Sequence, residues 1–474
     1  MMGRRRFLRN AGFGAVAAAG LTGCGSSGTA STPTPTPVVR NGFLLPPEGA
    51  PHEVTWMAYG ATPGVWGEEP ETAYGRDLTN ARIVARQDLV RLAATISRFE
   101  PVALLVNTAE DEAEAKRFLA EIIEASSPKD QVGSELDGSG RIYLGDVAKS
   151  ELPKIRTHPL DLVQMPLNDL WVRDTGPVFV RDASGALSAV NLNFNGWGQA
   201  PITTGLEGWR KDPRKAANGV VDQPIDQDRT VAAAIAADSG VPVLKTWLTM
   251  EGGGIEVNGH GLGVATESCI LNPNRNPGKQ KEEIEVELKR LFGIERMLWM
   301  PGRPGLEVTD WHVDFLARFT EPGNLLYASA EYGEAEDKRD RKALLKAVDE
   351  INALPADQRT RLLGGAKKLT TATLPEPDPA AVYKTYKARN QARPFTERSS
   401  DEFGQTAAPG YIGYYEANDC IVLGQYGDNA TDAEAFDTVA DAFPDKIVVQ
   451  ISTDGLCTGG GTIHCATQQQ PRKS

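Results

Sequence analysis

The chain has 474 residues, of which 41% are hydrophobic and 24% charged, and its formal net charge is −13. These values are typical of a globular protein with a large core, and no apolar run is long enough to be a membrane span. The acidic excess argues against nucleic acid as a partner, because binding phosphates requires basic side chains, and it favours the approach of cationic ligands.

Residues 1–23 have the pattern of an export signal. A basic start, with a twin arginine followed by Phe-Leu, precedes the apolar, small-residue segment Ala11 to Gly20. The start resembles a Tat signal, and Leu-Thr-Gly-Cys, which ends at Cys24, resembles a bacterial lipobox. We expect cleavage before Cys24 and lipidation of its thiol, which would anchor an exported bacterial protein at the outer face of the cytoplasmic membrane or in the periplasm. A disordered basic tail is the alternative.

Residues 24–46 are rich in Ser, Thr and Pro and contain too few apolar residues to fold, so we predict a lipidated cysteine followed by a flexible linker. Residues 47–471 are predicted to form a single catalytic domain. Its class is α/β, because strand-like runs alternate with helical periods. The charged segment at about 331–400, which prolines interrupt, is predicted to be a helical insertion with exposed loops.

The elements are predicted from hydrophobic periodicity. Strands are expected at residues 53–59, 102–106, 178–181, 187–194, 241–247, 261–271, 296–300, 313–319, 324–330, 411–415, 420–425 and 447–451. Helices are expected at residues 78–99, 109–123, 229–237, 279–291, 341–351 and 432–442.

Two clusters present a carboxylate beside a strand or a glycine turn. In the first, Asp174 comes shortly before the apolar run that starts at Val178, and a buried carboxylate is costly unless it is paired or binds a cation. An ion pair with Arg173 is the structural alternative. In the second, Glu251 precedes three glycines, whose backbone can approach a ligand closely.

A third cluster contains His312 and Asp314. If these residues lie in a strand, alternation places both side chains on one face, which suits a base and a carboxylate that meet in one cleft. A histidine two residues before an aspartate can also be half of a metal site. The remaining histidines form no matching ligand set, so we predict no metal.

The fourth cluster is the stretch 459–471, where three glycines precede Cys465 and polar residues follow it. A thiol in this setting is a candidate nucleophile, and a buried, inert thiol is the alternative. Cys269, Cys420 and Cys457 have no basic neighbours in sequence and are expected to be buried packing residues.

Together, motifs in these clusters resemble the agmatine deiminase family, which is related to the bacterial-type peptidylarginine deiminases of the guanidine-modifying superfamily. The likeness extends from about residue 51 to residue 471. It implies the pentein fold, a five-bladed α/β propeller with a central active site. The motifs are WVRDTGP at 171–177, EGGGIEVNG at 251–259, LNPNRNP at 271–277, HVD at 312–314 and GGGTIHCATQQQP at 459–471.

The resemblance implies a catalytic role for four residues. Cys465 would be the nucleophile and His312 the general acid and base. Asp174 and Asp314 would hold the substrate guanidinium, which suits two carboxylates because it is planar and cationic.

Three further residues are expected to bind substrate. Glu251 would support the same cation. Trp171 would line the substrate tunnel, and Trp197 lies in a loop, Asn195 to Gly198, that resembles the agmatine-type loop of the family.

The implied activity is hydrolysis of agmatine to N-carbamoylputrescine and ammonia, a reaction of polyamine metabolism on the way to putrescine. Cys465 would attack the guanidinium carbon while His312 protonates the departing ammonia. The covalent S-alkylthiouronium would then be hydrolysed by a water that His312 deprotonates. No metal or organic cofactor is implied.

Other functions stay open. Peptidyl-arginine or free arginine is the alternative substrate, because Arg210 and Arg214 could bind a carboxylate. A guanidine-binding lipoprotein without turnover is the alternative of another class. The sequence also departs from the family pattern at Gly413, where the family has asparagine, and at Trp311, where it usually has glycine.

Overall fold

The computed structural model describes residues 42–66, 73–125, 158–198, 223–305, 307–389 and 407–473. The predicted export signal, Cys24, Arg210 and Arg214 lie outside these residues. Among the described helices, none has both the length and the apolar character needed to cross a bilayer.

The described strands form five sheets. The sheets are β16 (Thr467–Pro471), β1 (His52–Tyr59), β2 (Val102–Val106) and β3 (Leu160–Gln164); β4 (Val178–Arg181), β5 (Leu187–Asn191) and β6 (Val243–Lys245); β7 (Glu256–Val257), β8 (Leu262–Thr266) and β9 (Arg296–Met300); β10 (Ala317–Glu321), β11 (Asn324–Ala328) and β12 (Thr370–Leu374); and β13 (Tyr415–Glu416), β14 (Cys420–Gln425) and β15 (Ile447–Ser452).

All five sheets share one pairing pattern. The first two strands of each sheet are antiparallel, and the third is parallel to the second. A parallel pair requires a crossover connection, which is usually helical. Here each crossover contains at least one helix, so a hairpin, a helix and a strand recur four times along the described chain, and in the remaining sheet the antiparallel pair joins β1 to β16.

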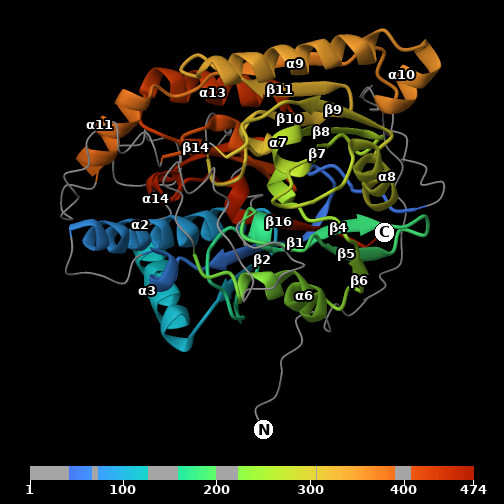
Figure 1. Cartoon of the computed structure of the whole chain (residues 1–474). Coiled ribbons are helices and arrows are strands. Elements are labelled where there is room, and N and C mark those ends of the chain that lie inside the picture. Colours follow the sequence, from blue (N-terminus) through green and yellow to red (C-terminus); the bar gives the residue numbers. More distant parts are fainter. Residues whose placement is uncertain are drawn as a thin grey trace, which may run out of the picture.

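The longer helices lie around the outside of the sheets in Figure 1, with α9 and α13 along the upper edge, α2 at the left and α6 below. The helices are α1 (Pro63–Trp66), α2 (Ala73–Ile96), α3 (Ala109–Ala125), α4 (Val172–Thr175), α6 (Asp228–Ser239), α7 (Glu267–Ile270), α8 (Lys281–Phe292), α9 (Ala335–Asn352), α10 (Ala356–Leu362), α11 (Pro379–Arg389), α13 (Asn429–Ala442) and α14 (Asp454–Thr458).

A short helical turn precedes the first strand of every sheet. These turns are α4 before β4 and the 3-10 turns η2 (Gly252–Gly254) before β7, η3 (Val313–Phe315) before β10, η4 (Tyr411–Gly413) before β13 and η5 (His464–Ala466) before β16. Turns that are far apart in sequence touch one another: η5 contacts α4, α4 contacts η2, η2 contacts η3, and η3 contacts η4. We call these five segments the central turns.

The predicted α/β class is confirmed, and several boundaries differ from the predictions. Apolar alternation predicted strands from residues 313 and 411, but each run begins with a central turn, and the strand predicted at 261–271 ends in α7. The predicted insertion at about 331–400 contains β12, which pairs with β11 and completes a sheet. This segment therefore supplies part of the repeated pattern as well as the charged helices α9 and α10.

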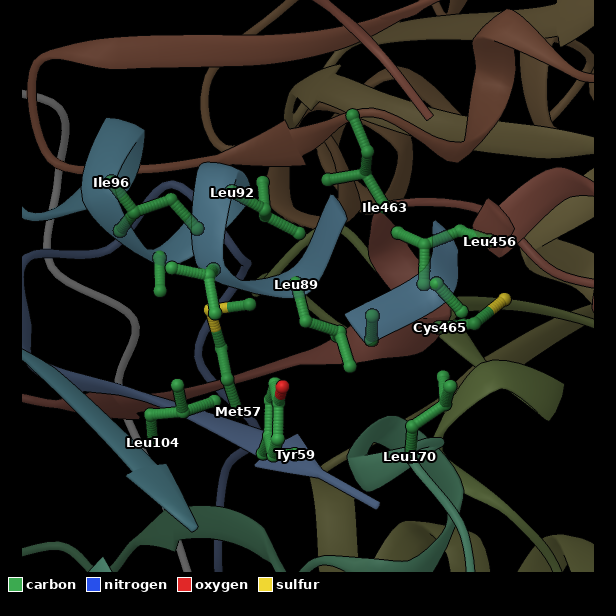
Figure 2. Packing of buried hydrophobic residues seen from close by; sticks show 14 of the residues in the cluster. Met57, Tyr59, Leu89, Leu92, Ile96, Leu104, Leu170, Leu456, Ile463 and Cys465 are labelled. Carbon is green, nitrogen blue, oxygen red and sulfur yellow. The ribbon is translucent and has the colours of Figure 1, made fainter. Parts of the chain in front are cut away.

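One hydrophobic cluster joins α2, the first sheet and the nucleophile loop. Leu89 and Leu92 of α2 are fully buried with Leu456 of α14, and Ile463 and Cys465 belong to the same cluster. Figure 2 shows these side chains converging from both helices and the C-terminal loop. The predicted thiol is therefore held against one side of the core.

Candidate active site

Cys465 lies in the turn η5, and its side chain is buried with 6% of the residue exposed. Its Sγ atom is 3.6 Å from Oδ2 of Asp314 and 3.5 Å from Oγ1 of Thr462. Burial raises the pKa of the Cys465 thiol well above its usual range, and the carboxylates of Asp314 and Asp174 raise it further. Without a ligand, the thiol is therefore held in its protonated form.

Asp314 and Asp174 come from two central turns and face the same space as the thiol. Asp174 accepts hydrogen bonds from the indole N–H of Trp197 at 2.9 Å and from the backbone N–H of Gly253 at 3.2 Å. Oδ1 of Asp314 is buried and has no hydrogen-bond partner among the described residues. A buried carboxylate oxygen without a partner is costly, so this atom is suited to receive a cationic donor.

Gly253 allows the acidic groups and the histidine to approach one another. A Cβ atom at this position would lie 2.7 Å from Nδ1 of His312, 3.0 Å from Oδ2 of Asp314 and 3.1 Å from Oδ1 of Asp174. Any side chain would push these groups apart. The glycine run after Glu251 is thus explained by packing within the site.

His312 lies between Asp174 and Glu251. Its Nε2 is 3.1 Å from Oε2 of Glu251, and its Nδ1 is 3.7 Å from Oδ1 of Asp174. Burial lowers the pKa of His312, but the negative charge of Asp174 and the contacts with Cys269 and Glu251 outweigh it and hold the pKa well above its usual range. The imidazole is therefore protonated at neutral pH and can act as an acid.

Glu251 pairs with His312 and with Arg275, and its contact with the substrate cation stays a prediction. The side chain is fully buried, and Nε of Arg275 donates to both of its oxygens at 2.9 Å. Burial raises the pKa of Glu251, but Arg275 and His312 outweigh it and bring it to about 2. A permanently ionised Glu251 therefore keeps His312 charged and oriented.

Glu251, Cys269 and His312 are close enough for one ion to reach an atom of each. The Cys269 Sγ atom lies 3.6 Å from Oε2 of Glu251, so this thiol is more than the packing residue that the sequence predicted. A divalent cation here would compete with the guanidinium of Arg275 for the same carboxylate. We therefore assign the cluster to the orientation of His312.

A second buried network lies beneath the thiol. Nδ1 of His464 is 2.8 Å from Oδ2 of Asp314, and its Nε2 is 2.8 Å from Oε2 of Glu48. Glu48 also pairs with Arg318 at 2.9 Å and with Arg173 at 3.4 Å. Burial raises the pKa of Glu48, but the neighbouring positive charges outweigh it and hold the pKa well below its usual range. The same Oδ2 atom of Asp314 thus contacts both His464 and the Cys465 sulfur, which fixes this carboxylate beside the thiol.

A cavity of about 810 Å³ opens onto Cys465, His312 and Asp174. Trp171 and Trp197 line it, and their contacts with a substrate stay a prediction. The wall also contains charged side chains farther along the cavity, namely Arg303, Glu307, Asp337, Arg341 and Glu376.

Trp311 lies in the wall with an unusual backbone. Its φ is +79°, in the left-handed region that a bulky residue rarely adopts, and Asp310 before it has a φ of +60°. The guanidinium of Arg303 stacks over the Trp311 ring at 3.9 Å. The family usually has glycine at this position, and glycine adopts this backbone conformation at lower cost than tryptophan does.

Residues 44–471 match the family described as Porphyromonas-type peptidyl-arginine deiminase. The chain belongs to this family. The agmatine deiminase of Stutzerimonas stutzeri is 29% identical over 91% of this chain and 96% of its own, and that of Pseudomonas aeruginosa is 29% identical over 93% and 98%.

Solved structures agree with this assignment. An agmatine deiminase of Enterococcus faecalis, solved while catalysing its reaction, matches with a TM-score of 0.64 and 25% identity over 93% of this chain and all of its own. The resemblance noted in the sequence and the pentein fold class are confirmed. Closure of the five sheets into a propeller stays a prediction.

Most of the site residues named from the sequence meet at this cavity. Cys465, His312, Asp174, Trp171 and Trp197 line it, and Asp314 lies against the thiol. Sequence reasoning missed Arg275, Thr462, His464 and Glu48 as parts of the site. Arg275 lies within the LNPNRNP motif, which offered a signal, whereas only the fold brings Glu48 to this place.

Proposed function

We propose that the protein is a hydrolase that removes ammonia from a guanidinium substrate, namely agmatine, and releases N-carbamoylputrescine. The observation that carries this proposal is the placement of two carboxylates, one with a free oxygen, around a buried thiol. Such a pair can bind the nitrogens of a planar cation and hold its carbon beside the sulfur.

The proposed first step couples substrate charge to nucleophile activation. A guanidinium between Asp174 and Asp314 offsets the negative charge that raises the pKa of the Cys465 thiol, so the thiol gives its proton to solvent water and the thiolate forms beside its target. The sulfur attacks the guanidinium carbon, and protonated His312 gives its proton to the nitrogen that leaves as ammonia.

The second step hydrolyses the covalent thiouronium. Neutral His312 removes a proton from a water, the resulting hydroxide attacks the same carbon, and the carbon–sulfur bond breaks to give the ureido product and the thiolate. His312 is then protonated again. Every group that these steps require belongs to the protein, the substrate or water.

The test is ammonia release from agmatine by the purified protein, with formation of the ureido product followed by mass spectrometry. We expect Cys465→Ser to lose turnover and covalent labelling while its melting temperature stays near that of the wild type. Cys420→Ser, which changes another buried cysteine, should retain labelling at Cys465. Turnover by Cys465→Ser would refute the assignment of the nucleophile.

Arginine or peptidyl-arginine is the second candidate substrate, because Arg303 and Arg341 line the same cavity and could pair with a carboxylate. Competition among agmatine, free arginine and a peptide with C-terminal arginine separates the candidates. If agmatine is the substrate, it should have the highest kcat/KM of the three compounds. Arg341→Met should then lower kcat/KM for agmatine no more than it lowers kcat/KM for arginine.

We further propose that the protein is exported and anchored through a lipid on Cys24. Support comes from the twin arginine, the apolar segment and the Leu-Thr-Gly-Cys sequence. Cys24→Ser should move the protein from the membrane fraction to the soluble extracytoplasmic fraction. A wild-type protein that stays in the cytoplasm would contradict the proposal.

A further inference from the structure

Gly413 of η4 faces Thr462, which lies three residues before the nucleophile and is 1% exposed. A Cβ atom at position 413 would lie 2.1 Å from Oγ1, 2.4 Å from Cβ and 2.7 Å from Cγ2 of Thr462. These separations are below the 3.0 Å that real Cβ atoms keep, so no side chain fits at 413 while Thr462 keeps its place.

The Thr462 hydroxyl in turn faces the reacting atom. Its Oγ1 lies 3.5 Å from Sγ of Cys465, and no other hydrogen bond of this hydroxyl occurs within the described part of the chain. This contact lowers the pKa of the Cys465 thiol, against the larger effects of burial and of the two carboxylates.

The surroundings of the sulfur make this contact important. Asp314 of η3 and Asp174 of α4 raise the pKa of the thiol through their negative charge, and His312 lines the same cavity. A thiolate accepts hydrogen bonds and cannot donate one, so the hydroxyl must be the donor once the sulfur is ionised. Hydrogen bonds to a charged group are stronger than those between neutral groups.

We propose that Thr462 is the hydrogen-bond donor that stabilises the Cys465 thiolate, and that residue 413 is glycine because this donor occupies the space of a side chain there. The inference rests on the proposed function only in taking Cys465 as the nucleophile.

The direct experiment measures alkylation of Cys465 in Thr462→Val and Thr462→Ser. Valine keeps the shape of the side chain and removes the hydroxyl, whereas serine keeps the hydroxyl. Labelling by 2-chloroacetamidine, whose positive charge offsets the two carboxylates, is followed between about pH 6 and 10. Labelling by neutral iodoacetamide is slower, because the free site disfavours the thiolate, and its rates are compared at the same pH values. The site of labelling is verified by mass spectrometry.

We expect Thr462→Val to label about tenfold more slowly near neutral pH, since a charge-assisted hydrogen bond is lost, and its pH profile to shift to higher pH. Thr462→Ser should label within about threefold of the wild type. Thr458→Val is the matched control, because the Thr458 hydroxyl donates to carbonyls of its own helix at 2.9 and 3.2 Å, and its labelling profile should not shift.

Position 413 provides the second test. Gly413→Ala should displace Thr462 and lower both the labelling rate and the melting temperature. The double variant Gly413→Ala with Thr462→Gly should recover the melting temperature, because the clash is removed, and still label as slowly as Thr462→Val. A folded double variant that labels at the wild-type rate would overturn the proposal.

A Thr462→Val protein with wild-type labelling rates and an unshifted profile would also overturn it. Failure of the proposed function gives a different result. In that case the wild type would release no ammonia from any guanidinium substrate, while the dependence of labelling on the Thr462 hydroxyl would remain measurable with iodoacetamide.

Discussion

Negative charge surrounds the thiol, and the positive groups of the site act on other atoms. Arg275 pairs with Glu251, and Arg318 pairs with Glu48 and Glu256. The free site therefore disfavours a thiolate until a cation enters. This arrangement limits the reactivity of Cys465 toward neutral and anionic electrophiles, because the group that activates the sulfur is the substrate itself.

The pH dependence of substrate capture should follow Asp174. Burial raises the pKa of this carboxyl to about 6, with Glu251 and Asp314 contributing and His312 and Trp197 opposing. Binding a guanidinium requires the ionised form, so we expect kcat/KM to fall as the pH drops through about 6. Initial rates at low substrate concentration between pH 5 and about 8 measure this limb.

Trp197→Phe is the matched variant for testing the fall of kcat/KM at low pH, which we call the acid limb of the pH profile. Phenylalanine keeps an aromatic wall and removes the N–H that donates to Asp174 at 2.9 Å. The ionised carboxyl loses a donor, so the limb should move to higher pH. An identical limb in Trp197→Phe and the wild type would show that another group controls capture.

At this scale, sequence motifs predicted the residues that touch the substrate space better than those that support them. Asp174, His312 and Cys465 each lie in a motif with a chemical reason for its residue types. Glu48 reaches the site through its contact with His464, which is far away in sequence. Thr462 keeps its place because Gly413 leaves the space that it occupies. Such contacts depend on the packed fold, which local patterns do not encode.

At the scale of elements, the central turns explain why the site residues are spread over the whole chain. Each turn precedes the first-listed strand of its sheet, so the strand fixes the turn and the turn presents its side chains to its neighbours. The alternation around His312 and Asp314 predicted a strand with both groups on one face. A single 3-10 turn also brings both groups to the site, and a pattern of five residues cannot distinguish the two conformations.

Packing of α2 against α14 should determine the stability of the nucleophile loop. Leu89 is fully buried in the cluster that contains Leu456 and Cys465. Leu89→Ala removes buried methyl groups and leaves a cavity, so we expect a loss of about 2–5 kcal/mol in the free energy of unfolding. Urea denaturation followed by circular dichroism measures this change.

Val286→Ala is the control for that substitution, because Val286 on α8 is 70% exposed. Its effect should stay within about 0.5 kcal/mol, as expected for a surface substitution. Equal destabilisation by the two variants would contradict the assignment of the core around Leu89.

At the scale of the whole molecule, buried ion pairs tie separate sheets together beneath the central turns. Arg318 of β10 is fully buried and pairs with Glu256 of β7 at 3.0 Å and with Glu48 at 2.9 Å. Burial lowers the pKa of Arg318, but the two carboxylates outweigh it and hold the pKa well above its usual range. The network gives the sheets a fixed relative position through directed contacts.

Replacing Arg318 by methionine should destabilise the protein by about 3–5 kcal/mol, because two carboxylates would remain buried without their cation. Arg361→Met is the comparison, since Arg361 is 55% exposed in its pair with Glu295. Its loss should cost at most about 1 kcal/mol. A similar shift of the urea midpoint in both variants would be the contradicting result.

The pairing of β1 with β16 has a consequence for the order in which the protein is made. The first strand of the domain finds its antiparallel partner only in the last one, and the turn before that last strand contains Cys465. A growing chain therefore contains Asp174, His312 and Asp314 before the Cys465 sulfur is available to join them. Catalytic competence arises in one late step, when the final strand is added beside β1.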